Sequence, residues 1–179
     1  MSGVWVFLEN KDGKIVTGSR EAVSAARTVA DGLGQQLTGL VFGEGVSGVA
    51  DAAFDLGVDA VLGADDATLA SFRVEAVGPL VTKLAQEHNP SVILASASSR
   101  GRDLAAWVAA DLDAGLVSDG VSVAMDGDSG VVTPRLRGQA AERRVCHQRH
   151  AGHHLAQPRL PAGRADGQER FGDVGGCCG

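Results

Sequence analysis

The first 133 residues contain no cysteine, and the whole chain contains no tyrosine and few other aromatic residues, which make up 4% of its length. No apolar run approaches the roughly 20 residues that a membrane-spanning helix needs. The start of the chain also lacks the basic segment that precedes the apolar core of a secretion signal. A cysteine-free domain suits a reducing compartment. These absences favour a cytoplasmic protein that does not insert into membranes.

Charge is divided unevenly along the sequence. Residues 1–133 carry 8 Lys or Arg against 18 Asp or Glu, a net charge of −10. Residues 134–179 carry 8 Arg and no Lys against 4 acids, a net charge of +4. An acidic surface repels phosphates, so the first part argues against nucleic acid as a partner. The chain of 179 residues is long enough for one domain with a core and an appendage.

Apolar runs alternate with helical patterns throughout residues 1–133. Runs of strand type occupy residues 4–9, 37–43, 59–65, 91–98 and 120–126, and helical spacing occupies residues 18–34, 46–57, 68–89 and 102–115. We expect Ser19 to cap the first helix and Gly34 to end it. Strands separated by helices predict βαβ units and a doubly wound, mostly parallel α/β sheet with helices on both faces, a Rossmann-like fold. The turn residues at 126–130 predict a hairpin that leads into an antiparallel excursion.

Residues 43–48, GEGVSG, match the pattern G-x-G-x-x-G after a strand and before a helix. Asp65 and Asp66 follow at about the distance of a ribose-binding acid. A single match of this kind is weak evidence, because glycine-rich turns are common in a chain with 25 glycines. A plain turn between strand and helix is the favoured interpretation.

A second candidate lies where the strand at 91–98 leads into a helix. Serine residues end the strand, and two arginines flank a glycine before the helix. The candidate anion- or nucleotide-binding residues are Ser98, Ser99, Arg100, Gly101 and Arg102. Free N–H groups, the helix dipole and guanidinium groups favour anions. The alternative, which we prefer, is that these residues fix the loop or contact another subunit, because no phosphate-loop lysine or acid–base pair accompanies them. No catalytic group of residues is identified, and His88 stands alone at a helix end.

The order of elements and one stretch near residue 100 carry a family resemblance. The opening VWVFLE and the stretch SASSRGRDLAAWVAADLDAGLVSDGVSV resemble the N-terminal domain of the electron-transfer flavoprotein alpha subunit over essentially residues 3–133. One departure is visible, because the family usually has Pro-Arg where Ala106-Trp107 stands here. Any ion pair made by the family arginine is therefore not carried over.

The resemblance implies an electron carrier, not an enzyme with its own substrate. In that family an alpha and a beta subunit form a heterodimer that moves electrons from dehydrogenases to an acceptor through FAD. The FAD is held mainly by a C-terminal domain of the alpha subunit, and no residue of this chain matches those flavin motifs. We therefore expect this chain alone to bind no FAD. The alternative from another class is a free-standing α/β domain that binds an adenine nucleotide at residues 96–103.

Residues 134–179 depart from the resemblance. The family continues with a segment such as R-P-x-Y-A-G-K, where this chain has PRLRGQAAERRV. One permitted coding of Pro134–Arg144, read one base later, gives P-A-Y-A-G-K-L-L-S-D-V, which is similar to the family. The sequence thus predicts an alpha subunit truncated by a frame change, with a non-native, disordered basic tail at 134–179.

Two alternatives for this tail remain open. An RNA-binding arm would use its arginines, although aromatic residues are nearly absent. A metal site would draw on its histidines and cysteines, whose spacing fits no closed zinc pattern well: Cys146, His147, His150, His153, His154, Cys177 and Cys178. We expect neither, and so no resident metal.

Overall fold

The computed structural model describes residues 3–118, 120–127, 129–134 and 143–145. The strands are β1 (Val4–Phe7), β2 (Asn10–Lys11), β3 (Lys14–Ile15), β4 (Leu37–Gly43), β5 (Ala60–Asp65), β6 (Val92–Leu94), β7 (Gly120–Asp126), β8 (Ser129–Pro134) and β9 (Arg143–Val145). The helices are α1 (Thr17–Leu33), α2 (Ser47–Asp55), the 3₁₀ turn η1 (Ala67–Leu69), α3 (Val74–His88) and α4 (Ser99–Asp111).

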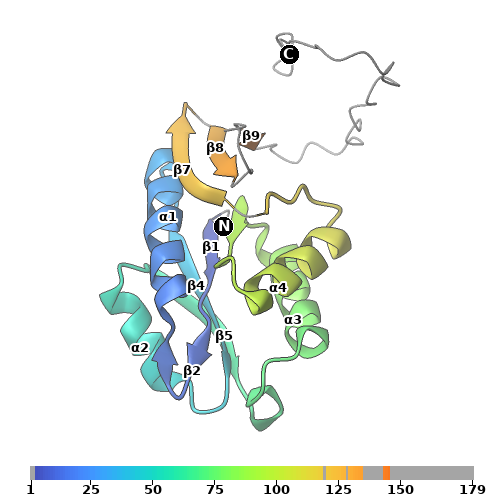
Figure 1. Cartoon of the computed structure of the whole chain (residues 1–179). Helices are drawn as coiled ribbons and strands as arrows, with labels where there is room; N and C mark the ends of the chain where they lie inside the picture. Colours follow the sequence, from blue (N-terminus) through green and yellow to red (C-terminus); the bar gives the residue numbers. More distant parts are fainter. Residues whose placement is uncertain (1–2, 119, 128, 135–142, 146–179) are drawn as a thin grey trace. The chain divides into compact units, whose positions relative to one another are not determined.

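A four-stranded parallel sheet forms the centre of the fold, with strand order β5-β4-β1-β6. Helices α1 and α2 lie on one side of it and α3 and α4 on the other (Figure 1). This confirms the predicted doubly wound α/β class, because strands covered on both faces can be apolar at every position. All seven residues of β4 are buried.

The side chains of the strands point alternately to the two faces of the sheet and so form two apolar clusters. Val4, Val6 and Leu8 face α1 and α2, whereas Trp5 and Phe7 face α3 and α4. Successive side chains of a strand point to opposite faces, so one strand serves both layers. The sheet therefore provides a rigid support for the loops at its carboxyl edge.

The starts of the first and third predicted helices differ from the sequence prediction. The first helix has Val16 in the capping position, without a side-chain cap, and Ser19 lies inside the helix and is fully buried. Gly34 ends this helix in the left-handed conformation, as predicted. The helix predicted from residue 68 is instead η1 followed by α3 from Val74, because the Asp66 carboxylate accepts a hydrogen bond from the Thr68 backbone N–H and closes a separate turn.

The strand predicted at 91–98 and the helix after it also differ. Strand β6 contains three residues, each half-buried, because it lies at one edge of the described sheet and not in its middle. Helix α4 begins at Ser99, three residues before the predicted start. Ser98 caps it by accepting a hydrogen bond from the Gly101 backbone N–H at 3.0 Å.

An antiparallel sheet of β7, β8 and β9 follows the parallel one, as the hairpin at 126–130 predicted. Gly127 supplies the left-handed turn residue, with φ 60°. Met125 of β7 packs on α1, and a Cβ on Gly32 would lie 2.5 Å from the Met125 Cγ. The glycine therefore lets β7 approach this helix.

The sheet continues beyond the predicted domain boundary at residue 133. β8 ends at Pro134, and Arg143–Val145 pair with it as β9. These three residues belong to the predicted disordered tail, yet they form a strand, because main-chain pairing needs no apolar pattern. The rest of the predicted tail, residues 135–142 and 146–179, lies outside the described residues.

Candidate functional site

The strand order creates a topological switch point between β1 and β6. The chain leaves β1 toward α1 on one face of the sheet, and leaves β6 toward α4 on the other face. Open α/β sheets bind ligands in the crevice at the carboxyl ends of such a strand pair. Residues that follow these two strands are therefore the first candidates for a site.

A buried carboxylate occupies this crevice. Glu9, which is 6% exposed, follows β1, and its Oε1 accepts hydrogen bonds from the hydroxyl groups of Ser96 and Ser98. The Ser98 Oγ lies 2.5 Å from that Oε1. The Glu9 backbone N–H donates to the Ser19 Oγ of α1 at 2.9 Å. One residue thus connects β1, α1 and the segment between β6 and α4.

The structure brings Ser98, one of the predicted anion-binding residues, onto this carboxylate, and it places Ser99, Arg100 and Arg102 at exposed positions in the first turn of α4. Ser98 also accepts a hydrogen bond from the Gly101 backbone N–H. The Arg100 guanidinium lies 5.7 Å from the centre of the Phe72 ring, a cation–π distance. The geometry favours hydrogen-bond donors over anions at the crevice, because a carboxylate already lies there.

Gly101 is required by the tightness of this turn. A Cβ on Gly101 would lie 2.1 Å from the Ser96 carbonyl oxygen, closer than any side chain can approach a backbone. Sequence reasoning identified the glycine and the serines of this corner, but it missed Glu9 and expected Ser19 to be a helix cap. An acidic residue directly after an apolar strand was the available signal for Glu9. Nothing signalled the bond of Ser19, since a serine near a helix start shows the same local pattern in either role.

The G-x-G-x-x-G segment forms the turn between β4 and α2. The Asp65 carboxylate accepts hydrogen bonds from the backbone N–H groups of Gly45 at 2.7 Å and of Val46 at 3.1 Å. Those donors are the ones that a phosphate would need at this helix start. The residue considered as a ribose-binding acid thus closes the loop, which agrees with a plain turn.

Another carboxylate stabilises the opposite edge of the sheet. Asp59 accepts hydrogen bonds from the Leu37 backbone N–H at 2.8 Å and from the Arg27 guanidinium at 2.6 Å. The hydrogen bond from the Leu37 backbone N–H is the largest cause that lowers the pKa of Asp59, and the hydrogen bond from Arg27 comes second. Similarly, the Thr68 hydroxyl and backbone N–H lower the pKa of Asp66. Both carboxylates remain ionised at neutral pH.

At the two positions where the sequence departs from the resemblance, Ala106 is exposed on α4 and Trp107 lies between α3 and α4. The Trp107 Nε1–H and the Thr82 hydroxyl both donate to Asp111 Oδ2, at 3.0 Å and 3.1 Å. The Trp107 ring lies on Gly78, where a Cβ would be 2.6 Å from the ring. The Trp107 ring therefore packs across the two helices and bonds Asp111 of its own helix, and the hydrogen bond that joins α3 to α4 comes from Thr82.

Among the residues described, no group of three His, Cys, Asp or Glu could hold a metal ion. The histidines and cysteines of the alternative metal site, from Cys146 onward, lie outside the described residues. The described helices include none with the length and apolar character to cross a membrane.

Comparison with known proteins gives a consistent result. Residues 4–151 match the model of the electron transfer flavoprotein domain. The FixB protein of Clostridium saccharobutylicum is 38% identical over 128 residues, which are 72% of this chain and 38% of that protein. Electron transfer flavoprotein alpha subunits of Clostridium acetobutylicum and Bacillus subtilis are 33% and 32% identical over 69% and 78% of this chain. These matches cover 37% and 43% of those subunits, so the chain spans about two fifths of the relatives' length.

Proposed function

This chain belongs to the electron transfer flavoprotein family, and we propose that it serves as the N-terminal α/β domain of an alpha subunit of such a carrier. The family match over residues 4–151 carries the proposal. The named alpha subunits among its relatives support it. The intact protein would carry electrons from dehydrogenases to an acceptor in the cytoplasm, without converting a substrate of its own.

FAD is the cofactor that the family name implies for the intact protein, and two places in this chain resemble nucleotide-binding positions of α/β folds. The crevice between β1 and β6 contains the Glu9 carboxylate, and the turn before α2 contains the Asp65 carboxylate. Each would repel the pyrophosphate of a dinucleotide. The pocket beside α2 measures about 260 Å³, below the usual size of about 300–1,000 Å³ for small-molecule sites. Neither place fits FAD.

The role proposed for this domain is therefore to bind a partner subunit. An exposed apolar segment follows α4, in which Leu116 is 44% and Val121 is 56% exposed. Contiguous exposed apolar surface marks a protein contact, and we propose that both side chains belong to such a surface. The beta subunit of the carrier is the proposed occupant.

Co-expression with the beta subunit of the same organism tests the proposal. We expect the full chain to co-purify with a tagged beta subunit as a 1:1 complex in sedimentation analysis. Replacing Leu116 and Val121 together by Ser should weaken that complex, whereas replacing the exposed Phe54 of α2 by Ser should not. The purified chain alone should show no flavin absorbance after incubation with FAD.

Two results would overturn the proposal. One is a chain that forms no complex with the beta subunit although it is folded by circular dichroism. The other is binding of adenine nucleotides by the chain alone at micromolar concentration, which would favour the free-standing nucleotide-binding domain.

A further inference from the structure

One continuous stretch of the sequence is acidic and contains no Lys or Arg. Residues 28–72, which form the end of α1, then β4, α2, β5 and η1, contain seven Asp or Glu. Arg27 of α1 pairs with two of them, Asp31 and Asp59. Within the described part of the chain, Asp51, Asp55 and Asp65, on α2 and at the end of β5, form no ion pair. Asp51 and Asp55 are exposed on α2, one turn apart, and Phe54 between them is 50% exposed. A surface of this kind attracts cationic partners and repels anions.

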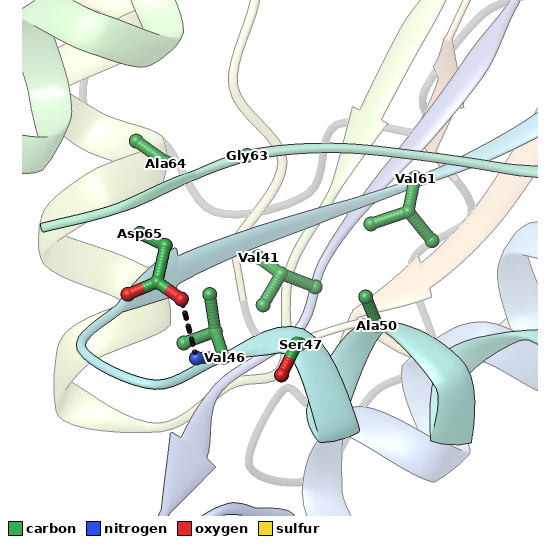
Figure 2. A pocket seen from close by; sticks show the side chains of 8 residues that line it. All are labelled: Val41, Val46, Ser47, Ala50, Val61, Gly63, Ala64 and Asp65. Atoms are coloured by element: carbon green, nitrogen blue, oxygen red, sulfur yellow. Dashed lines mark hydrogen bonds between the residues drawn. The ribbon is translucent and has the colours of Figure 1, made fainter.

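An apolar pocket lies within this acidic region. It has a volume of about 260 Å³ and lies between the first turns of α2 and the carboxyl half of β5. Figure 2 shows the side chains of Val41, Val46, Ala50 and Val61 around it, with Asp65 at its end. The pocket is large enough for one aliphatic side chain, and its charged end is acidic.

The adjacent strand is an edge. In the described sheet β5 pairs with β4 on one side, and no described strand pairs with its other side. Gly63 is exposed on β5, and Val61 is half-buried. Both line the pocket. An extended segment added to an exposed strand edge places alternate side chains on one face, which here is the face of the pocket.

We propose that β5 and the pocket beside α2 form a docking surface for an extended cationic segment of a partner protein. The segment pairs with the free edge of β5 and inserts one aliphatic side chain between Val46, Ala50 and Val61. Its Lys or Arg side chains face Asp51, Asp55 and Asp65. This surface is separate from the proposed contact at residues 116–121, and the proposal does not depend on the electron-carrier function.

Charge decides between the possible occupants. A second copy of this chain would bring the same acidic edge against itself, and like charges at a strand edge oppose pairing. A phosphate-bearing ligand is disfavoured because Asp65 already accepts from the N–H groups at the start of α2. A cationic segment is not repelled by the acidic side chains and does not need the N–H groups that Asp65 occupies.

A labelled seven-residue peptide of alternating Arg and Val tests the proposal, with a peptide of alternating Glu and Val as its control. We expect fluorescence anisotropy to show binding of the arginine peptide alone, weakened about tenfold from low to physiological ionic strength. Hydrogen exchange should slow at residues 60–65 when the peptide binds. Protection confined to another part of the chain would overturn the proposed site.

Matched variants separate specific docking from general attraction. Asp51→Lys with Asp55→Lys should weaken peptide binding by about tenfold or more, since two exposed ion pairs are lost and two like charges take their place. Glu75→Lys with Glu87→Lys on α3 makes the same change in net charge and should alter binding less than about twofold. Ala50→Leu fills the pocket without changing charge and should also weaken binding. Equal losses in both charge variants, or self-association that Ala50→Leu abolishes, would contradict the proposal.

Discussion

Replacing Glu9 by alanine tests whether the buried carboxylate holds the carboxyl edge of the sheet together. Glu9 is 6% exposed and accepts hydrogen bonds from Ser96 and Ser98. Each hydrogen bond to a charged group contributes about 1.5–3 kcal/mol, and an unmatched buried hydroxyl adds a penalty. We therefore expect Glu9→Ala to lower the free energy of unfolding by about 3–5 kcal/mol.

Urea unfolding followed by tryptophan fluorescence measures this loss, because Trp5 is 2% exposed in the core. With a slope of about 2 kcal/mol per molar urea, the midpoint should fall by about 1.5–2.5 M. Glu9→Gln keeps an acceptor oxygen and should cost only about 1–2 kcal/mol. Glu87→Ala, at an exposed position on α3, should change stability by less than about 0.5 kcal/mol. A midpoint for Glu9→Ala within about 0.5 M of the unaltered chain would refute the role assigned to the carboxylate.

Three further predictions concern packing and pH. Gly78→Ala should destabilise the chain by about 1–2 kcal/mol through its clash with the Trp107 ring. The same change should become stabilising by up to about 1 kcal/mol when Trp107→Ala removes that ring, and thermal melts of the unaltered chain, the two single variants and the double variant check this change of sign. Asp59→Asn should cost about 1 kcal/mol at neutral pH. The pKa of Asp59 in the folded state lies below its value in the unfolded state. The difference in unfolding free energy between the unaltered chain and Asp59→Asn should therefore stay constant above about pH 5 and shrink as the pH falls through the folded-state pKa. Urea titrations at several pH values measure this difference. Gly32→Ala should displace Met125 and speed hydrogen exchange in β7 while β1 and β4 stay protected; unchanged exchange in β7 would argue against that anchor.

The order and type of the longer elements were predictable from the sequence, because they depend on local patterns, whereas the short elements β2, β3, η1 and β9 were not predicted. Apolar runs and helical spacing indicated the strands and helices of the α/β domain, and Gly34 marked a helix end that the structure confirms. The hairpin before β8 followed from its turn residues, and Gly127 adopts the expected left-handed conformation. These features involve neighbours within a few positions, so tertiary contacts were not needed to recognise them.

The tertiary structure alone decided which elements lie beside one another. Strand β6 has the apolar sequence of an interior strand but lies at an edge of the described sheet, since pairing partners are chosen between distant segments. The same long-range order brings Glu9 to Ser96 and Ser98 across 87 and 89 positions of sequence, and buries Ser19 as an acceptor instead of a helix cap. A serine has the same local preferences in either role. Ser19 accepts a hydrogen bond because the fold places the Glu9 backbone N–H, directly after β1, beside its hydroxyl group.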